Sequence, residues 1–293
     1  MSKEKLPAYG GQALIEGVLM RGKKGLAAAF RTPNGEIEIR SEELMGIYKT
    51  NIRKYPFLRG LILLWDSLGL GMQYLTISAN LQLDEDEEKL EGGSMFATIG
   101  ISLLIGVGLF FLAPAGFGQF IENQLQWQPW AGNLVEGLVR LIMIILYIWG
   151  VGKMEDIERV FSYHGAEHKT INAYEDGAEL IPEVVSKYSV EHPRCGTGFL
   201  LTLVIFSIIL FSALGPLPLL WKLVSRVLLI PVLAGFAYEY MKWTADHLDN
   251  PIVSKLVRPN MLLQHLTTRE PDLQMLEVSI AAFNNMLEME SSD

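Results

Sequence analysis

Apolar residues gather in this chain into runs that are long enough to cross a lipid bilayer. Four segments consist mostly of Leu, Ile, Val, Phe, Gly and Ala, at about 95–114, 134–151, 198–214 and 223–240. A hydrocarbon core about 30 Å thick needs roughly 20 such residues in a helix. Half of all positions are apolar, which is high for a soluble domain with this degree of clustering. The sequence therefore predicts an all-α membrane protein built on a bundle of four transmembrane helices.

A fifth apolar segment, from Phe57 to about Ala79, is interrupted by charge. It is rich in Leu, Ile and Trp but carries Arg59 near its start and Asp66 near its middle. A central charge costs roughly 2.5–3.5 kcal/mol on insertion, whereas each large apolar residue favours insertion by about 0.3–0.6 kcal/mol, so the balance is close to zero. We expect an amphipathic helix here that is interfacial or re-entrant, followed by an acidic loop at Asp84–Glu88.

The distribution of Lys and Arg predicts the side of the membrane on which each segment lies. Residues 1–60 hold 11 of the 24 Lys and Arg, whereas the predicted loop from Ala115 to Asn133 holds none. Because cations concentrate in cytoplasmic loops, the N-terminus is expected in the cytoplasm, and four crossings return residues 152–197 and the C-terminal tail to that side. A polar, basic region precedes the first apolar stretch, so we expect no cleavable signal. The expected setting is the cell membrane, crossed several times, with the lipid bilayer as partner.

The same patterns divide the chain into six regions. Alternation from Leu26 to Arg40 around Pro33-Asn34-Gly35 predicts a small cytoplasmic β-hairpin. In the tail, Thr267 and Glu270 have capping-box spacing ahead of an apolar pattern of helical period, which predicts an amphipathic helix that packs on its own protein. The expected regions are 1–56 with the hairpin, 57–94 with the amphipathic helix and acidic loop, 95–151 and 198–240 with one transmembrane pair each, 152–197 as a cytoplasmic segment, and 241–293 as the cytoplasmic tail.

Composition excludes several functional classes. The net charge of −9 comes in good part from the run Asp84–Glu88, and there is no basic stripe, so no nucleic-acid partner is expected. Cys195 is the only cysteine, which excludes an intrachain disulfide and leaves metal ligation open. No internal repeat is detectable, which gives a transporter little support.

The sharpest feature is a cluster of histidines beside the third apolar run. His164, His168 and His192 are three of the five histidines and fall within 29 residues. Helical periodicity around the first two predicts a helix that stops near Asp176-Gly177, so His164 and His168 share a face. Two imidazoles four residues apart can reach one zinc ion at roughly 2.0–2.1 Å. Glu167 completes a His-x-x-Glu-His pattern, in which the glutamate activates water as a base.

A catalytic zinc needs a third protein ligand that this pattern does not supply. His192 and Cys195 are favoured because both lie on the same cytoplasmic segment, just before a span. The other candidates are Glu239, Asp246 and His247. A structural interpretation stays open beside the metal: juxtamembrane histidines also bond carbonyls, and a lone cysteine is more often a small buried side chain. His265 has no neighbouring carboxylate in sequence and is interpreted as ordinary surface.

Two further sets of polar residues need an explanation. Gln12 and Glu16 lie in a glycine-containing stretch and are candidates for outer contacts to the histidines, against the simpler interpretation of a tight turn in which glycine permits unusual backbone angles. Arg140 falls within the second span, where it either pairs with Glu136 or Glu239 or extends to the headgroups.

Four motifs of this chain resemble a known family, the YqhQ-like bacterial membrane proteins. The motifs are Tyr9-Gly10-Gly11-Gln12-Ala13 with Glu16-Gly17-Val18, Tyr163-His164-Gly165-Ala166-Glu167-His168-Lys169, His192-Pro193-Arg194-Cys195-Gly196-Thr197 and Thr267-Thr268-Arg269-Glu270-Pro271. The resemblance covers nearly the whole chain. It implies a multi-pass membrane protein with a suspected metal site and no established substrate.

Two hypotheses of function follow. The first is a membrane-embedded metal-dependent hydrolase with a divalent ion, zinc by its donors, on His164 and His168, Glu167 as base, and His192 or Cys195 completing the site. The second is a non-enzymatic scaffold or assembly factor whose histidines are structural. The residues leave the substrate, the pathway and the oligomeric state open.

Overall fold

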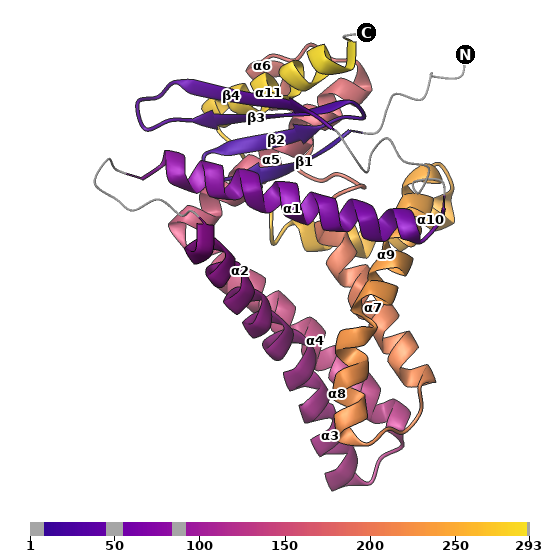
Figure 1. The fold of residues 1–293 in the computed structure, drawn as a ribbon. Helices are drawn as coiled ribbons and strands as arrows, with labels where there is room; N and C mark the ends of the chain where they lie inside the picture. The colour runs from indigo at the N-terminus through magenta and orange to yellow at the C-terminus, as the bar shows by residue number, and fades with distance from the viewer. Residues whose placement is uncertain (1–8, 45–54, 84–91, 292–293) are drawn as a thin grey trace.

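A computed structural model describes residues 9–44, 55–83 and 92–291 of the chain (Figure 1). A small sheet with its covering helices lies at one end, and long apolar helices extend away from it. The predicted acidic loop at Asp84–Glu88 lies outside the described residues.

The N-terminal region forms a four-stranded antiparallel meander. Its strands are β1 (Gly10–Leu14), β2 (Gly17–Arg21), β3 (Gly25–Arg31) and β4 (Ile37–Glu43), and they pair in sequence order. The predicted hairpin is β3 with β4, and β1 and β2 add a second hairpin that sequence patterning missed.

The expectation of a glycine turn in the first motif needs correction. Gly10 and Gly11 lie inside β1, and the turn that follows is made at Glu16, whose φ of 51° is left-handed. Residue 11 is glycine because there is no space for a side chain, not because of its backbone angles. An added Cβ would lie 2.5 Å from the Leu19 carbonyl oxygen. Glycine is therefore required at residue 11 for close approach of neighbouring groups.

Both faces of the sheet are covered by helices. One face packs against α5 (Glu155–Asp176) and α11 (Leu273–Ser291), through a shared core that includes Met20, Tyr163 and Phe283. The other face packs against α1 (Leu58–Leu81), through Leu19, Phe30 and Tyr74. In Figure 1, α1 lies across the molecule between the sheet and the long helices. Because both faces of the sheet are buried, β2 and β3 carry apolar side chains at successive positions rather than an alternation of apolar and polar side chains.

Three described helices are long and apolar enough to cross a membrane, or four if a bent pair counts as one span. The first runs from Met95 to Leu125 and comprises α2 (Gly92–Val107), a π-helical stretch η3 (Gly108–Leu112) and α3 (Ala113–Leu125). The second is α4 (Pro129–Val151), and the third includes α7 (Thr197–Ala213).

The predicted loop from Ala115 to Asn133 is mostly helical. The first run continues to Leu125, and α4 begins at Pro129. Glycines explain this extension, because a Cβ added at Gly118 would lie 2.8 Å from the Gly132 carbonyl oxygen, so α3 and α4 approach closely where loop residues were expected.

The fourth predicted span is broken. It consists of α8 (Leu219–Leu228) and α9 (Ile230–Asp246), which meet at Leu229 with an angle of 45°. Pro231, in the first turn of α9, has no N–H to continue the hydrogen-bond ladder of α8, which is the usual cause of such a bend.

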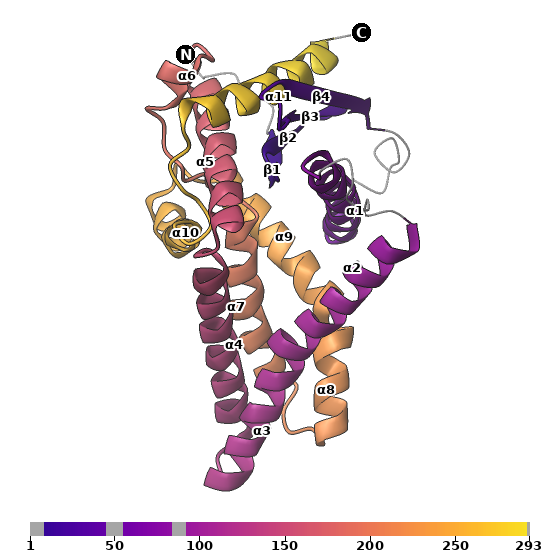
Figure 2. The ribbon, with the colours of Figure 1, turned by 90° about the vertical axis from the view of Figure 1, so that its left-hand side faces the viewer.

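The C-terminal tail begins with a helix that sequence patterning missed, α10 (Pro251–Gln264), and ends with the expected amphipathic helix α11. The predicted capping box at Thr267 is wrong, because α11 is capped instead by Asp272, whose carboxylate accepts from the N–H of Met275 at 2.8 Å. A short helix, α6 (Pro182–Val185), follows α5. Figure 2 shows α5 continuing beyond α4, away from the long helices.

Charged side chains are buried between the long helices. Arg140 is only 1% exposed and pairs with Glu136 at 2.8 Å, so it does not extend to the headgroups. Arg226 of α8 binds the same carboxylate at 2.7 Å and donates to Asn133. Glu239, the alternative partner, instead accepts from Arg59 of α1. Arg226, which lies in the first half of the bent pair, is not among the residues predicted from sequence.

Candidate metal centre

Helix α5 places His164 and His168 on one face, one turn apart. The helix begins with acidic residues in its first turn, which suit the positive end of a helix dipole, and it stops at Gly177, whose φ is 77°. The two imidazole rings lie 4.3 Å apart between centroids. The predicted helix, its stop and the shared face are all present.

Backbone carbonyls fix the orientation of both rings. Nδ1 of His164 lies 2.9 Å from the carbonyl oxygen of Thr267, and Nδ1 of His168 lies 2.6 Å from that of Val190. A carbonyl can only accept, so in each neutral ring Nδ1 carries the proton and Nε2 keeps its lone pair. This is the arrangement in which histidine binds a metal through Nε2, with the second nitrogen held by an outer partner.

Cys195 supplies a third donor atom to the same point. Its Sγ lies 3.2 Å from Nε2 of His164, and the donor atoms of His164, His168 and Cys195 all lie within 4.8 Å of one another. Tetrahedral zinc holds sulfur and nitrogen ligands roughly 3.5 Å apart, so this set needs little rearrangement to close around an ion. The N–H of Thr197 also donates to Sγ at 3.4 Å and so helps to hold the sulfur in position. The donor set therefore fits a zinc ion in both chemistry and spacing.

A cavity of about 440 Å3 lies against these three residues. Its walls come from α5, from the segment that precedes α7, from Thr267 and from residues 9–13 of the sheet region. If these three residues held an ion, the open space beside them would leave a fourth position for water or a substrate, as catalytic zinc sites require.

Glu167 forms part of the cavity wall and is 5% exposed. Burial raises its pKa to about 7, although the nearby His164 and the N–H of Gly11 both act to lower it. A Cβ added at Gly11 would lie 3.0 Å from the Glu167 carboxyl carbon, so β1 holds this side chain in place. A carboxylate that titrates near neutral pH is suited to accept a proton from water.

His192 lines the cavity, but its ring is directed to another partner. Its Nε2 lies 3.7 Å from Glu175, which also binds Arg194, and this nitrogen has no hydrogen-bond partner among the described residues. Burial holds the pKa of His192 below its ordinary value, so the ring is neutral at neutral pH. Of the two third ligands favoured by sequence, the structure brings Cys195 to the histidine pair and leaves His192 beside it.

The remaining candidates from sequence lie elsewhere or play other parts. Gln12 lines the cavity with its side chain close to Gly71 of α1. Glu16 accepts two hydrogen bonds from Arg159 and thereby ties the β1–β2 turn to α5. These two residues lie near α5, but neither contacts a donor atom of the centre in the described structure.

The candidates at the end of the last apolar segment and after it do not reach the centre. Glu239 binds Arg59, Asp246 is exposed, and His247 bonds the carbonyl of Trp243 at 2.8 Å. His265, interpreted as lacking a carboxylate, pairs with Glu191, which approaches it from the segment before α7.

Sequence reasoning missed the groups that orient the ligands. The carbonyls of Thr267 and Val190 leave no sequence signature, because every residue carries one. Gln264 holds His192 through its backbone, and only the path of the folded chain brings these two residues together.

Comparison with known proteins places the chain in a family. The chain belongs to the family described as "Protein of unknown function (DUF1385)", which it matches over residues 55–289, a range that contains all three donors. It is 35% identical over 306 residues to "Uncharacterized protein YqhQ" of Bacillus subtilis (strain 168), covering 99% of this chain and 96% of that protein. No solved structure matches the chain. The resemblance to YqhQ-like proteins is thereby confirmed.

Proposed function

We propose that this chain is a membrane-bound, metal-dependent hydrolase whose ion is held by His164, His168 and Cys195. The observation that carries the proposal is the convergence of three donor atoms within 4.8 Å beside a cavity, with both histidine Nδ1 atoms committed to carbonyls. A set that served only as structural hydrogen bonds would have no need to bring two imidazoles and a thiol to one point.

Each residue has a distinct part in the proposed reaction. When bound, a divalent ion supplies Lewis acidity that makes water a nucleophile near neutral pH. Glu167 takes the proton of the attacking water, since burial brings its pKa to about 7. The N–H of Gly11 donates to Glu167 and holds it at the cavity wall.

The packing of the ends of the chain supports four membrane crossings. Helix α11 packs on β2 and β3, so the sheet and the C-terminal helix must lie on the same side of a membrane. An even number of crossings must therefore separate them. Three spans would place α11 on the opposite side, so this argument favours counting α8 and α9 as one bent span.

The same argument supports the proposed orientation. The sheet, α5 and α11 share one core, and this body carries Arg159, Lys169 and Arg194, whereas the connection between α3 and α4 carries no Lys or Arg. Cations concentrate on the cytoplasmic side. We therefore place the metal centre on the cytoplasmic face of the cell membrane, next to the start of α7.

Metal analysis of the detergent-purified protein tests the proposal. Wild type is expected to hold about one zinc per chain, and His164→Ala with His168→Ala is expected to hold none, because two of three ligands are lost. His247→Ala is the matched control, since His247 is exposed directly after α9 and is not one of the three donors. An unchanged metal content in the double variant would remove the metal centre.

Glu167→Gln separates catalysis from a scaffold role. It keeps the size of the side chain and all three donors, so it should retain metal and fold while abolishing hydrolysis across a panel of phosphoester, ester and peptide substrates. Under the scaffold hypothesis, loss of cellular function instead follows loss of protein stability in every variant, and Glu167→Gln behaves as wild type.

A further inference from the structure

Helix α10 has one buried face and one outward face of mixed apolar and basic character. Val253, Val257 and Asn260 are buried against the rest of the protein. The outward face exposes Ile252 (70%), Leu256 (50%) and Leu262 (67%), with Lys255 and Arg258 also exposed. The helix contains no acidic residue. A helix with this composition is typical of a segment that lies in the surface layer of an anionic membrane.

The position of α10 agrees with that composition. Asn260 packs on Gly198 in the first turn of α7, where a Cβ would meet its side chain at 2.9 Å, and it donates to Thr202 at 3.3 Å. Asn260 therefore fixes α10 beside the beginning of an apolar helix that is long enough to be a span. Figure 2 shows α10 at the level where α4 ends and α5 begins. This is the depth at which headgroups would surround the protein.

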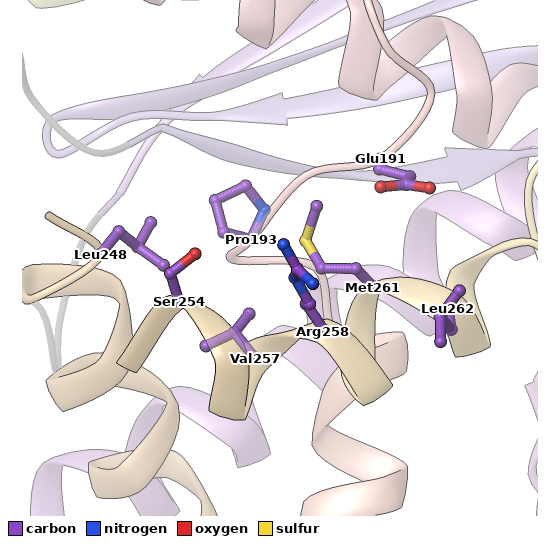
Figure 3. A pocket seen from close by; sticks show the side chains of 8 residues that line it. All are labelled: Glu191, Pro193, Leu248, Ser254, Val257, Arg258, Met261 and Leu262. Atoms are coloured by element: carbon purple, nitrogen blue, oxygen red, sulfur yellow. The ribbon is translucent and has the colours of Figure 1, made fainter. Parts of the chain in front are cut away.

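A cavity of about 620 Å3 lies between α10 and the segment that leads to Cys195 (Figure 3). Apolar side chains line most of it: Pro193, Leu248, Val257, Met261 and Leu262. Its polar lining consists of Ser254, Arg258 and Glu191, and Glu191 is already paired with His265. In Figure 3, the guanidinium of Arg258 and the hydroxyl of Ser254 both point from α10 toward Pro193.

We propose that this cavity binds the headgroup of an acidic phospholipid, with Arg258 on the phosphate. The inference rests on the proposed membrane setting. Among the described residues, the guanidinium of Arg258 makes no hydrogen bond or ion pair, so its donors are free to bind two phosphate oxygens at once. Ser254 offers a hydroxyl to the same group, and the apolar lining accommodates the glycerol and upper acyl carbons. Lys255 adds attraction to the anionic surface.

The test is a lipid titration of full-length protein purified in a neutral detergent. The readout is the thermal unfolding midpoint as dioctanoyl phosphatidylglycerol is added, with dioctanoyl phosphatidylcholine and inorganic phosphate as separate arms. Phosphatidylglycerol is expected to raise the midpoint at concentrations where the other two have no effect. Arg258→Gln should raise the half-effective concentration at least tenfold, and Arg258→Lys should give an intermediate value because it keeps the charge without the planar fork.

Lys187→Gln is the matched control, since Lys187 is an exposed cation beside α6, at the far end of the molecule from the long helices. Equal responses of wild type and Arg258→Gln to phosphatidylglycerol would overturn the proposal, as would an equal response of wild type to inorganic phosphate. Failure of the membrane setting is recognised separately, because the protein would then be recovered from cells without detergent.

Discussion

Gln264 holds the backbone of His192 through two hydrogen bonds, one to each side of the same residue. Its Oε1 accepts from the His192 N–H and its Nε2 donates to the His192 carbonyl, both at 2.9 Å. This contact joins the end of α10 to the segment that carries Cys195, three residues further along the chain. These two hydrogen bonds therefore help to position the segment of Cys195, a donor of the proposed metal centre, although Gln264 is not one of the donors itself.

Gln264→Ala is expected to weaken metal binding about tenfold. This is the lower end of the range of about 10–100-fold for loss of a residue that supports a metal site without binding the metal. The change also leaves two buried backbone groups of His192 without partners, so the free energy of unfolding should fall by about 1–3 kcal/mol. Zinc competition with a chromophoric chelator measures the first effect and denaturant titration the second. Gln274→Ala, on the exposed side of α11, should change neither. Equal zinc affinity in the two variants would contradict the positioning role.

Gly11→Ala is expected to disturb the base while Gly10→Ala leaves it in place. A Cβ at residue 11 would lie 2.5 Å from the Leu19 carbonyl and 3.0 Å from the Glu167 carboxyl carbon, whereas at residue 10 it would meet nothing within 4 Å. We expect Gly11→Ala to lower the free energy of unfolding by about 1–3 kcal/mol, as overpacking does. Hydrolytic activity should fall in Gly11→Ala alone, and identical behaviour of the two variants would argue against a tight contact between β1 and Glu167.

The stability of metal-free protein should fall as pH rises from about 4.5 to 7. Burial raises the pKa of Glu167 from 4.5 to about 7, so within that window the folded protein keeps a proton that the unfolded chain has released. The resulting loss of folding stability is absent when the pH is below the pKa of Glu167 in the unfolded chain. It is complete when the pH is above the pKa of Glu167 in the folded protein, and amounts to about 3 kcal/mol or less. Chemical denaturation of chelator-treated protein across this pH range should show the fall in wild type. Glu167→Gln should lack it, and parallel profiles would refute the raised pKa.

Glu136→Gln should destabilise the long helices without affecting the metal centre. Glu136 is shared by Arg140 and Arg226, both 1% exposed, so removing its charge leaves two buried cations with only neutral partners. Loss of one partner of a buried ion pair costs about 3–5 kcal/mol. The unfolding midpoint in detergent should drop sharply while zinc content per folded chain stays constant. Glu183→Gln, at an exposed position of α6, is the control, and an equal midpoint in both variants would show that the pairing contributes little.

The features that sequence could predict are those with local periodicity. Helix α5, its stop at Gly177 and the shared face of His164 and His168 follow from spacing alone. The missed strand β2 lacks alternation because helices cover both faces of the sheet, and β1 begins with Gly-Gly-Gln, which carries no strand pattern. The bend at Leu229 was missed because the apolar pattern continues through it, and only Pro231 marks the break.

The choice between His192 and Cys195 could not be made from sequence. Both lie on one short segment, and which of them reaches the histidine pair depends on contacts with residues of α5. The ring of His192 lies beside Glu175, whereas the thiol of Cys195 lies beside His164. For the same reason, the distances to Glu239, Asp246 and His247 depend on the tilt of α9. Their sequence positions at or after the end of a span carry no information on that tilt.

The packing of α11 on the sheet delays completion of the folded core until the end of synthesis. Roughly 240 residues separate β3 from the helix that completes its core. At about 5–20 residues per second, the ribosome needs roughly 12–50 s to synthesise them, and all the apolar helices must be inserted in that interval. During that time the face formed by Met20, Ala27 and Ala29 has no C-terminal helix to cover it. A nascent chain of this protein therefore presents an aggregation-prone surface to chaperones until its last helix emerges.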